Sequence, residues 1–198
     1  MEIDPVEAAD VSEPANRDHA RLNTWVAITV ALLATFLGIC KVKDDNIVQA
    51  MQQAQADKLD HWAYYQSRTL RADVAEATAT QLALAKAGAA PDQGAAYDAA
   101  IASYRAKATE QATKRDALKA QAEADQAAYD ALNYRDDQFD LSDALLAIAI
   151  ALLAVTALTG LWPLFFAALV PTFFGVLMGV AGLAALPIHP DALVKLLS

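Results

Sequence analysis

Two pairs of adjacent carboxylates are the residues whose type and spacing could do chemistry in this chain. Asp44-Asp45 follows one long apolar run, and Asp136-Asp137 precedes another. Hard cations prefer clustered carboxylate ligands, so the two pairs would form a cation site if the fold brought them together. Charges on long helices are usually a solvated face, however, and we favour an acidic collar in water. The basic residues near this collar are Lys41, Lys43 and Arg135.

The histidines and the single cysteine lack the spacing of a metal or nucleophile site. His19, His61 and His189 lie far apart in the sequence, and Cys40 has no histidine beside it. Such sites need short, regular spacing or a compact fold that gathers the groups. The glycines form neither a phosphate-binding loop nor a dinucleotide fingerprint. We therefore expect no enzyme activity, no metal and no cofactor, and we expect Cys40 to be a buried thiol.

Charge and hydropathy indicate a membrane protein instead. Residues 22–40 and 144–188 contain no charged side chain, although the chain of 198 residues has a net charge of -9. One bilayer crossing takes roughly 20 apolar residues, so the first run fits one crossing and the second fits two. The lipid bilayer is therefore an expected partner. Nucleic acid is not, because an acidic chain lacks the basic surface that nucleic acid requires.

The pattern predicts an all-α membrane protein with three transmembrane helices and a long antiparallel, coiled-coil-like hairpin between the first and the second. The acidic N-terminal sequence predicts a disordered tail, Trp162-Pro163 predicts a turn between the last two spans, and Pro171 should kink the third. The expected segments are a disordered acidic tail (1–21), the first transmembrane helix (22–40), a water-exposed hairpin (41–140) with its tip at 88–92, the second (141–161) and third (164–186) transmembrane helices, and a short C-terminal tail (187–198).

The first arm of the hairpin should continue the first span as one helix. Gly38 is the only weak point between them, and a lone glycine costs only about 1 kcal/mol. The arm should end between residues 86 and 90, where Gly88 stops the helix, Pro91 follows and Asp92 begins the next helix. Large apolar residues at helical spacing predict its contact face. They are Ile47, Met51, Leu59, Trp62, Leu70, Val74 and Leu84.

The returning arm shows the heptad pattern of a coiled coil, in which contact positions alternate by three and four residues. Both arms would be about 70–77 Å long at 1.5 Å per residue, which favours two matched arms packed antiparallel. Trp62 and Tyr65 then share a packing face, and Trp62 lies opposite Ala122. The contact positions of the returning arm are Tyr97, Ile101, Tyr104, Ala108, Gln111, Arg115, Leu118, Ala122, Asp125, Tyr129 and Leu132.

Three glycines in the third span are candidate helix-packing residues. Gly175 and Gly179 form a G-x-x-x-G pattern, which Gly182 extends. Small residues four apart let two helices approach closely in lipid. The pattern predicts a helix contact and leaves open whether the partner helix belongs to the same chain.

The run GICKVKDDNIVQAMQQAQADKLDHWAYYQ resembles the signature of a bacterial family, the domain of unknown function 4337. The resemblance covers nearly the full length of the chain. It implies an acidic tail, one span, a helical loop and two closing spans. It implies no activity that could be assigned to particular residues.

We expect a non-enzymatic integral membrane protein whose hairpin is an assembly or scaffold module. The contact face is rich in alanine and interrupted by polar residues, so a lone two-helix rod of this length would be weakly stable. Self-association, or association with another protein, would supply the missing burial, and a homo-oligomer is the expected form. The alternative is an oligomeric channel or a subunit of a transport complex, in which Thr156, Thr159 and Thr172 could line a pore.

Basic residues near the span ends predict the orientation in a bacterial inner (cytoplasmic) membrane. Lys41, Lys43 and Arg135 lie at the hairpin ends of the spans, and Lys195 falls on the same side. Only Arg17 and Arg21 lie on the other side. This asymmetry predicts a cytoplasmic hairpin and C-terminus, with the N-terminus outside.

Overall fold

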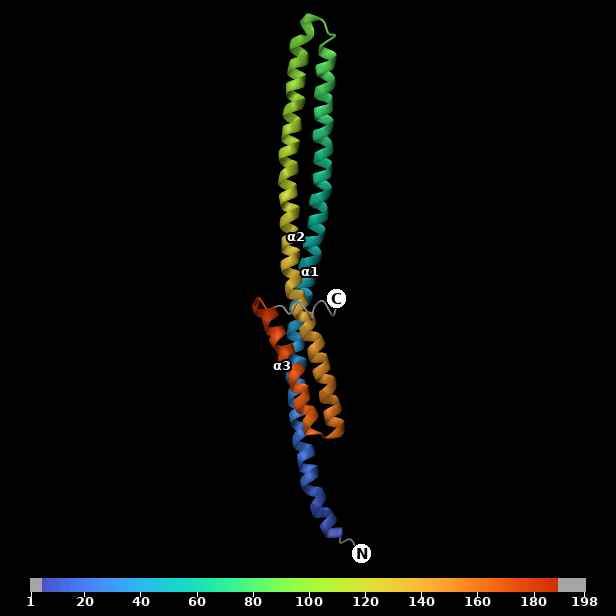
Figure 1. The fold of residues 1–198 in the computed structure, drawn as a ribbon, viewed down its shortest axis with the longest axis vertical. Helices are drawn as coiled ribbons and strands as arrows, with labels where there is room; N and C mark the ends of the chain where they lie inside the picture. Colours follow the sequence, from blue (N-terminus) through green and yellow to red (C-terminus); the bar gives the residue numbers. More distant parts are fainter. Residues whose placement is uncertain (1–4, 189–198) are drawn as a thin grey trace. The chain divides into compact units, whose positions relative to one another are not determined.

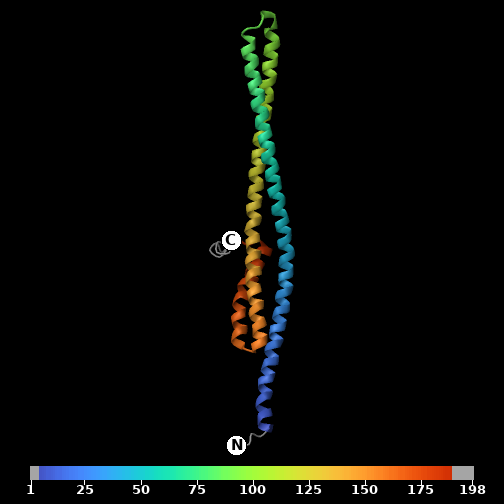
Figure 2. The ribbon, with the colours of Figure 1, turned by 90° about the vertical axis from the view of Figure 1, so that its right-hand side faces the viewer.

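The computed structural model describes residues 5–188, with side chains from Arg17 onward, and this part of the chain is helical (Figure 1). Its elements are α1 (Pro5–Lys86), the short 3-10 helix η1 (Pro91–Gln93), α2 (Gly94–Thr159) and α3 (Trp162–Ala184). The long helices α1 and α2 pack against each other in both views (Figures 1 and 2). Contacts divide the chain into two compact units. We call Met1–Gln49 with Leu132–Ser198 the three-helix unit, and Ala50–Ala131 the two-helix unit.

Helix α1 has no break where the apolar run meets the charged sequence, because strong helix formers follow Cys40 without a proline or glycine. The helix also extends further toward the N-terminus than expected. Residues 17–21 are helical, so the prediction of a disordered tail is wrong for these residues. The physical reason is propagation: each residue added to an existing helix gains a hydrogen bond without a new nucleation cost. Residues 1–4 lie outside the described part.

The core of the three-helix unit takes side chains from all three helices. Leu22, Val26 and Leu33 of α1 pack with residues of α2 and α3. The α2 and α3 members of this buried cluster are Leu146, Ala149, Leu153, Phe165 and Ala168. Cys40 is buried as predicted, with 3% of its surface exposed. Three helices of the described part are long and apolar enough to cross a membrane.

The two-helix unit is built on small residues. On α1, Ala72, Ala75 and Ala79 are buried, and on α2 the buried residues include Ile101 and Ala122. All the heptad positions predicted on α2 from Tyr97 to Tyr129 are buried or half-buried. Alanine brings the two backbones close together, but each contact removes little apolar surface from water.

The predicted contact face of α1 is wrong at four positions in this unit, although Met51 is buried and Trp62 is half-buried as predicted. Leu59, Leu70, Val74 and Leu84 are between 57% and 72% exposed. A set of buried and half-buried positions of α1 is instead spaced alternately by three and four residues, and thus follows one face of the helix. They are Met51, Ala54, Lys58, His61, Tyr65, Arg68, Ala72, Ala75, Ala79, Leu82 and Lys86.

Both turns differ in detail from the sequence prediction. After α1, the backbone N–H groups of Ala87, Gly88 and Ala89 each bond the carbonyl three residues earlier, so a tightened last turn ends the helix. Gly88 is not in the left-handed conformation, which among the described glycines only Gly160 adopts, with φ 69°.

The second turn lies before Trp162-Pro163 rather than at it. Gly160 and Leu161 connect α2 to α3, and Pro163 stands in the first turn of α3. Proline fits there because the first N–H groups of a helix have no intrahelical partner. Helix α3 then continues across Pro171 to Ala184.

Candidate functional site

The glycines of α3 lie against α1 and α2 of the same chain. A Cβ atom built on Gly175 would lie 2.8 Å from the nearest side-chain atom of α2. One on Gly179 would lie 2.7 Å from the Phe36 ring, and one on Gly182 would lie 2.8 Å from the Phe139 ring. Real Cβ atoms do not approach so closely, so glycine is required for this packing. The contact that the sequence left open is thus made within one chain.

A row of polar side chains on α2 donates hydrogen bonds to backbone carbonyls in and just beyond the C-terminal half of α3. Arg135 Nη2 donates to the Gly182 carbonyl at 2.9 Å, and Ser142 Oγ donates to the Gly175 carbonyl at 2.8 Å. Between them, Gln138 Nε2 donates to two carbonyls beyond the end of α3, at 2.9 and 2.6 Å. Gln138 and Ser142 are fully buried. Because each donor bonds a particular backbone carbonyl, the row fixes the position of α3 along the axis of α2.

Sequence reasoning missed this row. The hydroxyl residues predicted to line a pore do not include Ser142, and Arg135 is predicted only as a basic residue near the acidic collar. The signal was nevertheless present, since residues 135, 138 and 142 are spaced by three and four and therefore share one helix face.

The two acidic pairs come together in the three-helix unit. Asp44 is buried, with 4% of its surface exposed, whereas its neighbour Asp45 has 61% of its side chain exposed. Asp44 Oδ2 accepts a hydrogen bond from Lys41 Nζ at 2.8 Å. This bond is the first reason that the pKa of Lys41 is raised. Asp44 Oδ1 is buried and accepts no hydrogen bond from the described residues when the neighbouring acids are ionised.

Asp136 of α2 faces Asp44 within hydrogen-bonding reach. Burial, this hydrogen bond and the nearby carboxylates raise the pKa of Asp136 to about 6. Burial and Asp44 also raise the pKa of Asp140, one turn further along α2. Two ionised carboxylates repel each other and cannot share a hydrogen bond, so the nearby Asp44 favours the protonated form of Asp136.

Polar pairs join α1 and α2 in the two-helix unit. His61 Nδ1 lies 2.6 Å from Asp125 Oδ2, and Lys58 Nζ donates to Gln126 at 2.7 Å. Two further pairs join the helices: Arg68 donates to Gln111 at 2.8 Å, and Lys86 pairs with Asp98. Gln111 and Asp125 looked like interruptions of the heptad pattern, but in the structure they are the acceptors of cross-helix bonds.

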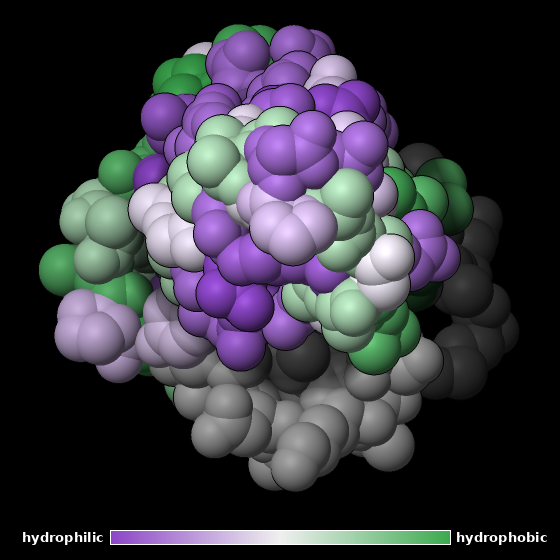
Figure 3. Space-filling view, turned by 90° about the horizontal axis from the view of Figure 1, so that it is seen from above, coloured by the Kyte–Doolittle hydropathy of each residue, from purple (hydrophilic) through white to green (hydrophobic). Residues whose placement is uncertain are grey.

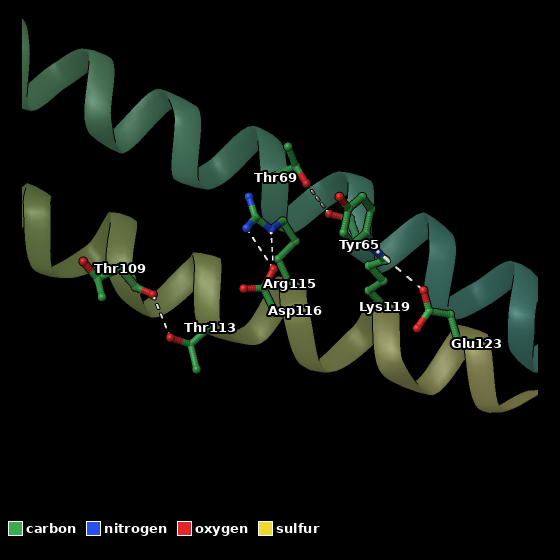
Figure 4. Close-up of polar contacts among 8 residues, drawn as sticks. All are labelled: Tyr65, Thr69, Thr109, Thr113, Arg115, Asp116, Lys119 and Glu123. Carbon is green, nitrogen blue, oxygen red and sulfur yellow. Dashed lines mark hydrogen bonds and ion pairs between the residues drawn. The ribbon is translucent and has the colours of Figure 1, made fainter.

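Other polar side chains of this unit bond within their own helix (Figure 4). Arg115, a heptad position, turns to Asp116 at 2.8 Å, and Lys119 lies 3.8 Å from Glu123. Thr69 donates to the carbonyl of Tyr65 at 3.0 Å. The Tyr65 ring also meets Trp62 edge to face, with centroids 5.2 Å apart. Exposed contacts of this kind each contribute little to stability.

The remaining packing residues predicted from sequence lie on the expected side of α2. Ile101 is buried, and the others are half-buried: Tyr97, Tyr104, Leu118, Tyr129 and Leu132. Trp62 and Tyr65 of α1 are half-buried as well.

Large apolar side chains line the opposite side of α1. We call Leu59, Leu70, Val74 and Leu84 the outer stripe. At 100° per residue they fall within about 80° of one another, on the side facing away from the buried alanines. Leu70 and Val74 also line a groove of about 360 Å³ with Tyr104 of α2, bordered by basic residues. Viewed onto the end that carries η1, the surface mixes purple hydrophilic residues with smaller green apolar areas (Figure 3).

The described residues contain no group of three or more histidine, cysteine or acidic side chains arranged to hold a metal ion. His19 lies near Gly160, while His61 belongs to the Asp125 pair. His189 lies outside the described residues. The features with functional potential are therefore the neighbouring carboxyl groups of Asp44 and Asp136 and the exposed outer stripe.

Comparison with known protein families identifies the family of this chain. The family model described as Domain of unknown function (DUF4337) matches residues 22–185. Neither the curated proteins nor the solved structures contain a match. The matched region includes the glycine face of α3, the polar row of α2 and the paired arms. The chain therefore belongs to the family Domain of unknown function (DUF4337).

Proposed function

We propose that this protein is a non-enzymatic, multi-pass membrane protein whose antiparallel helical hairpin assembles copies of the chain into a homo-oligomer. The spans would be residues 22–40, 141–159 and 162–184. Two features support this layout. Three helices are apolar and long enough to cross a bilayer. The cross-helix pairs also fit antiparallel packing, because residue numbers increase along α1 while those of the partners on α2 decrease, from Lys58–Gln126 to Lys86–Asp98.

The outer stripe is the observation that carries the assembly proposal. In a two-stranded coiled coil the positions facing away from the partner are normally polar. Here three leucines and a valine occupy them, each more than half exposed. Fully burying such a side chain contributes about 1.5–3 kcal/mol, so four of them would supply several kcal/mol to an interface.

A second copy of the same chain fits the stripe for two reasons. Residues 50–131 hold nine basic and eleven acidic residues, so two hairpins would not strongly repel. Membrane insertion would also hold every copy at one depth and in one direction. Each stripe residue would then stand level with its own equivalent on the neighbour, as a symmetric interface requires.

The contact between the two arms of the hairpin buries little apolar surface, so burial of the outer stripe would add to stability. Its buried positions are mainly alanine, and several heptad positions are polar residues that bond across the helices. These bonds select the register, but each contributes only about 1 kcal/mol net. Burial of the outer stripe would add apolar contact that the two arms alone do not provide.

The particle mass of the detergent-solubilised protein tests the proposal. Wild type should be a dimer or larger, and Leu70→Lys should shift it toward monomer because a charge would enter the interface. Ala106→Lys, at an exposed position of α2 away from the stripe, is the matched control and should leave the mass unchanged. A monomeric wild type, or a Leu70→Lys variant with wild-type mass, would contradict the assembly.

A cysteine experiment tests the symmetry. In a Cys40→Ser background, Leu70→Cys should form a disulfide between two copies in the membrane, while Ala106→Cys should not. Cross-linking at position 106 alone would place the interface on α2.

The channel alternative receives less support from the spans. The Thr156 hydroxyl donates to the Leu152 carbonyl and the Thr172 hydroxyl to the Ala168 carbonyl, each at 2.8 Å. Thr156 is also fully buried. Both hydroxyls therefore bond their own helix rather than offering a free polar lining. Ion flux through proteoliposomes containing the protein would reverse this preference.

We place the protein in a bacterial inner membrane with the hairpin and C-terminus in the cytoplasm and the N-terminus outside. Four basic residues on the hairpin side (Lys41, Lys43, Arg135 and Lys195), against Arg17 and Arg21 on the other, support this orientation. A reporter fused after Ser198 should be active only in the cytoplasm, and periplasmic activity would invert the topology.

A further inference from the structure

We propose that Asp44 and Asp136 form a binding site for a single proton at the end of the three-helix unit, with Asp136 donating its hydrogen to the buried Asp44 carboxylate. The site is separate from the outer stripe, which lies in the two-helix unit, and it does not depend on self-assembly. It takes a proton rather than a metal ion, because the described residues supply no metal-binding group of three or more ligands.

The buried Asp44 carboxylate is the observation that calls for a ligand. Its side chain is 6% exposed, and Lys41 satisfies only Oδ2. Oδ1 has no donor among the described residues when all nearby acids are ionised. Leaving a buried charged oxygen unpaired is costly, and a proton on Asp136 removes that cost by turning a repulsive contact into a hydrogen bond.

The cavity beside Asp44 is too small for a hydrated cation to replace Asp136 as the hydrogen-bond donor. The adjoining cavity measures about 10 Å³, which is at the lower limit for one water molecule. Apolar side chains close much of it. Its lining residues are Leu37, Cys40, Lys41, Asp44, Phe139 and Asp143. A hydrated cation with its own water shell would not fit, whereas a proton held between two carboxyl groups needs no cavity.

The surrounding charges favour uptake of one proton. Helix α1 contributes the Lys41 ammonium and Asp45 beside Asp44, and residues 162–188, including α3, carry no ionisable side chain. On α2 the facing groups are all acidic. They are Asp136, Asp137, Asp140 and Asp143. Protonation of one carboxyl group reduces the repulsion among these negative charges. The raised pKa of Asp136 is consistent with Asp136 as the group that binds the proton.

Infrared titration of the full chain in lipid nanodiscs tests the site. Wild type should gain one protonated-carboxyl band with a midpoint near pH 6 as the pH falls from 8 to 5. Asp136→Asn should abolish that band. Asp44→Asn should lower the midpoint so that half-protonation of Asp136 needs at least a tenfold higher proton concentration, because the negative charge of the accepting carboxylate is removed.

Asp45→Asn is the matched control. It removes the neighbouring exposed carboxylate and should leave the midpoint within a few tenths of a pH unit. The isosteric Asn variants should keep the wild-type helical circular dichroism, and the wild-type titration is informative without any variant. Three results would overturn the site: no carboxyl titrating between pH 5 and 7, a band that survives Asp136→Asn, or a midpoint that Asp44→Asn leaves unchanged. A midpoint lowered by millimolar Mg²⁺ at constant ionic strength would identify a cation site instead.

Discussion

Replacing Gly179 by alanine should loosen the packing of α3 against the rest of the three-helix unit. The added Cβ would lie 2.7 Å from Cε1 and Cζ of Phe36 on α1 and 2.8 Å from Ser142 Oγ on α2. Both distances are below any normal carbon contact, so at least one neighbour must move. The Phe36 ring would leave its position against the core, and the Ser142 hydroxyl would be pushed from the Gly175 carbonyl.

The cost can be estimated from these two contacts. Overpacking a closely packed site by one methyl group costs about 1–3 kcal/mol. Losing the buried Ser142 hydrogen bond would add about 1 kcal/mol. The sum is about 2–4 kcal/mol, and at roughly 2–4 °C per kcal/mol for a chain of this size the melting temperature should fall by roughly 4–16 °C. Gly179→Leu should cost more, because a longer side chain would separate the two backbones.

Thermal melting in detergent, followed by circular dichroism, measures the effect. Gly38→Ala is the matched control, because a Cβ at Gly38 meets no atom within 4 Å. Ala154→Leu, at an exposed position of α2, is a second control and should be tolerated. If Gly179→Ala melted like wild type, the glycine face would not be in contact with α1 and α2, and the inferred packing of α3 would be refuted.

Three further predictions address other contacts. Asp136→Asn should stabilise the protein by about 1–2 kcal/mol at pH 7.5 and by much less at pH 4.5. The native state of the wild type binds the proton more tightly than the unfolded state, so the stability of the wild type falls as the pH rises through about 6. Equal effects of the substitution at the two pH values would contradict this reasoning. Ser142→Ala should cost about 1–2 kcal/mol in chemical unfolding, since the Gly175 carbonyl loses its side-chain donor; Ser142→Thr, which keeps the hydroxyl, would separate this loss from a packing effect. In a double-mutant cycle, His61→Ala should lose about 1 kcal/mol only while Asp125 is present, and strictly additive losses would show that the pair does not interact.

The sequence alone determined the features that depend on local pattern. A charge-free run as long as a bilayer is thick predicts a span whatever its neighbours are. The heptad positions from Tyr97 to Tyr129 on α2 were also predictable, because isoleucine, leucine and tyrosine occupy five of the ten and set the spacing. The G-x-x-x-G spacing likewise predicted a close helix contact at Gly175 and Gly179, where the structure has one. In each case the pattern and the packing use the same residues.

Tertiary structure decided which face of α1 is buried. Leucine and valine marked one face, but an alanine-rich inner contact let Ala72, Ala75 and Ala79 face α2 and left Leu70 and Val74 outside. Alanine is buried here because close backbone approach, rather than large side-chain area, governs the contact. Hydrophobic spacing cannot reveal that choice.

The acidic pairs show the same division. Their position at the ends of the apolar runs is a property of the sequence. Asp44 and Asp45 are chemically identical neighbours, yet one is buried beside Asp136 and the other is exposed. A helix turns by about 100° per residue, so adjacent side chains point to different surroundings, and only the packed partner determines which carboxyl loses its water.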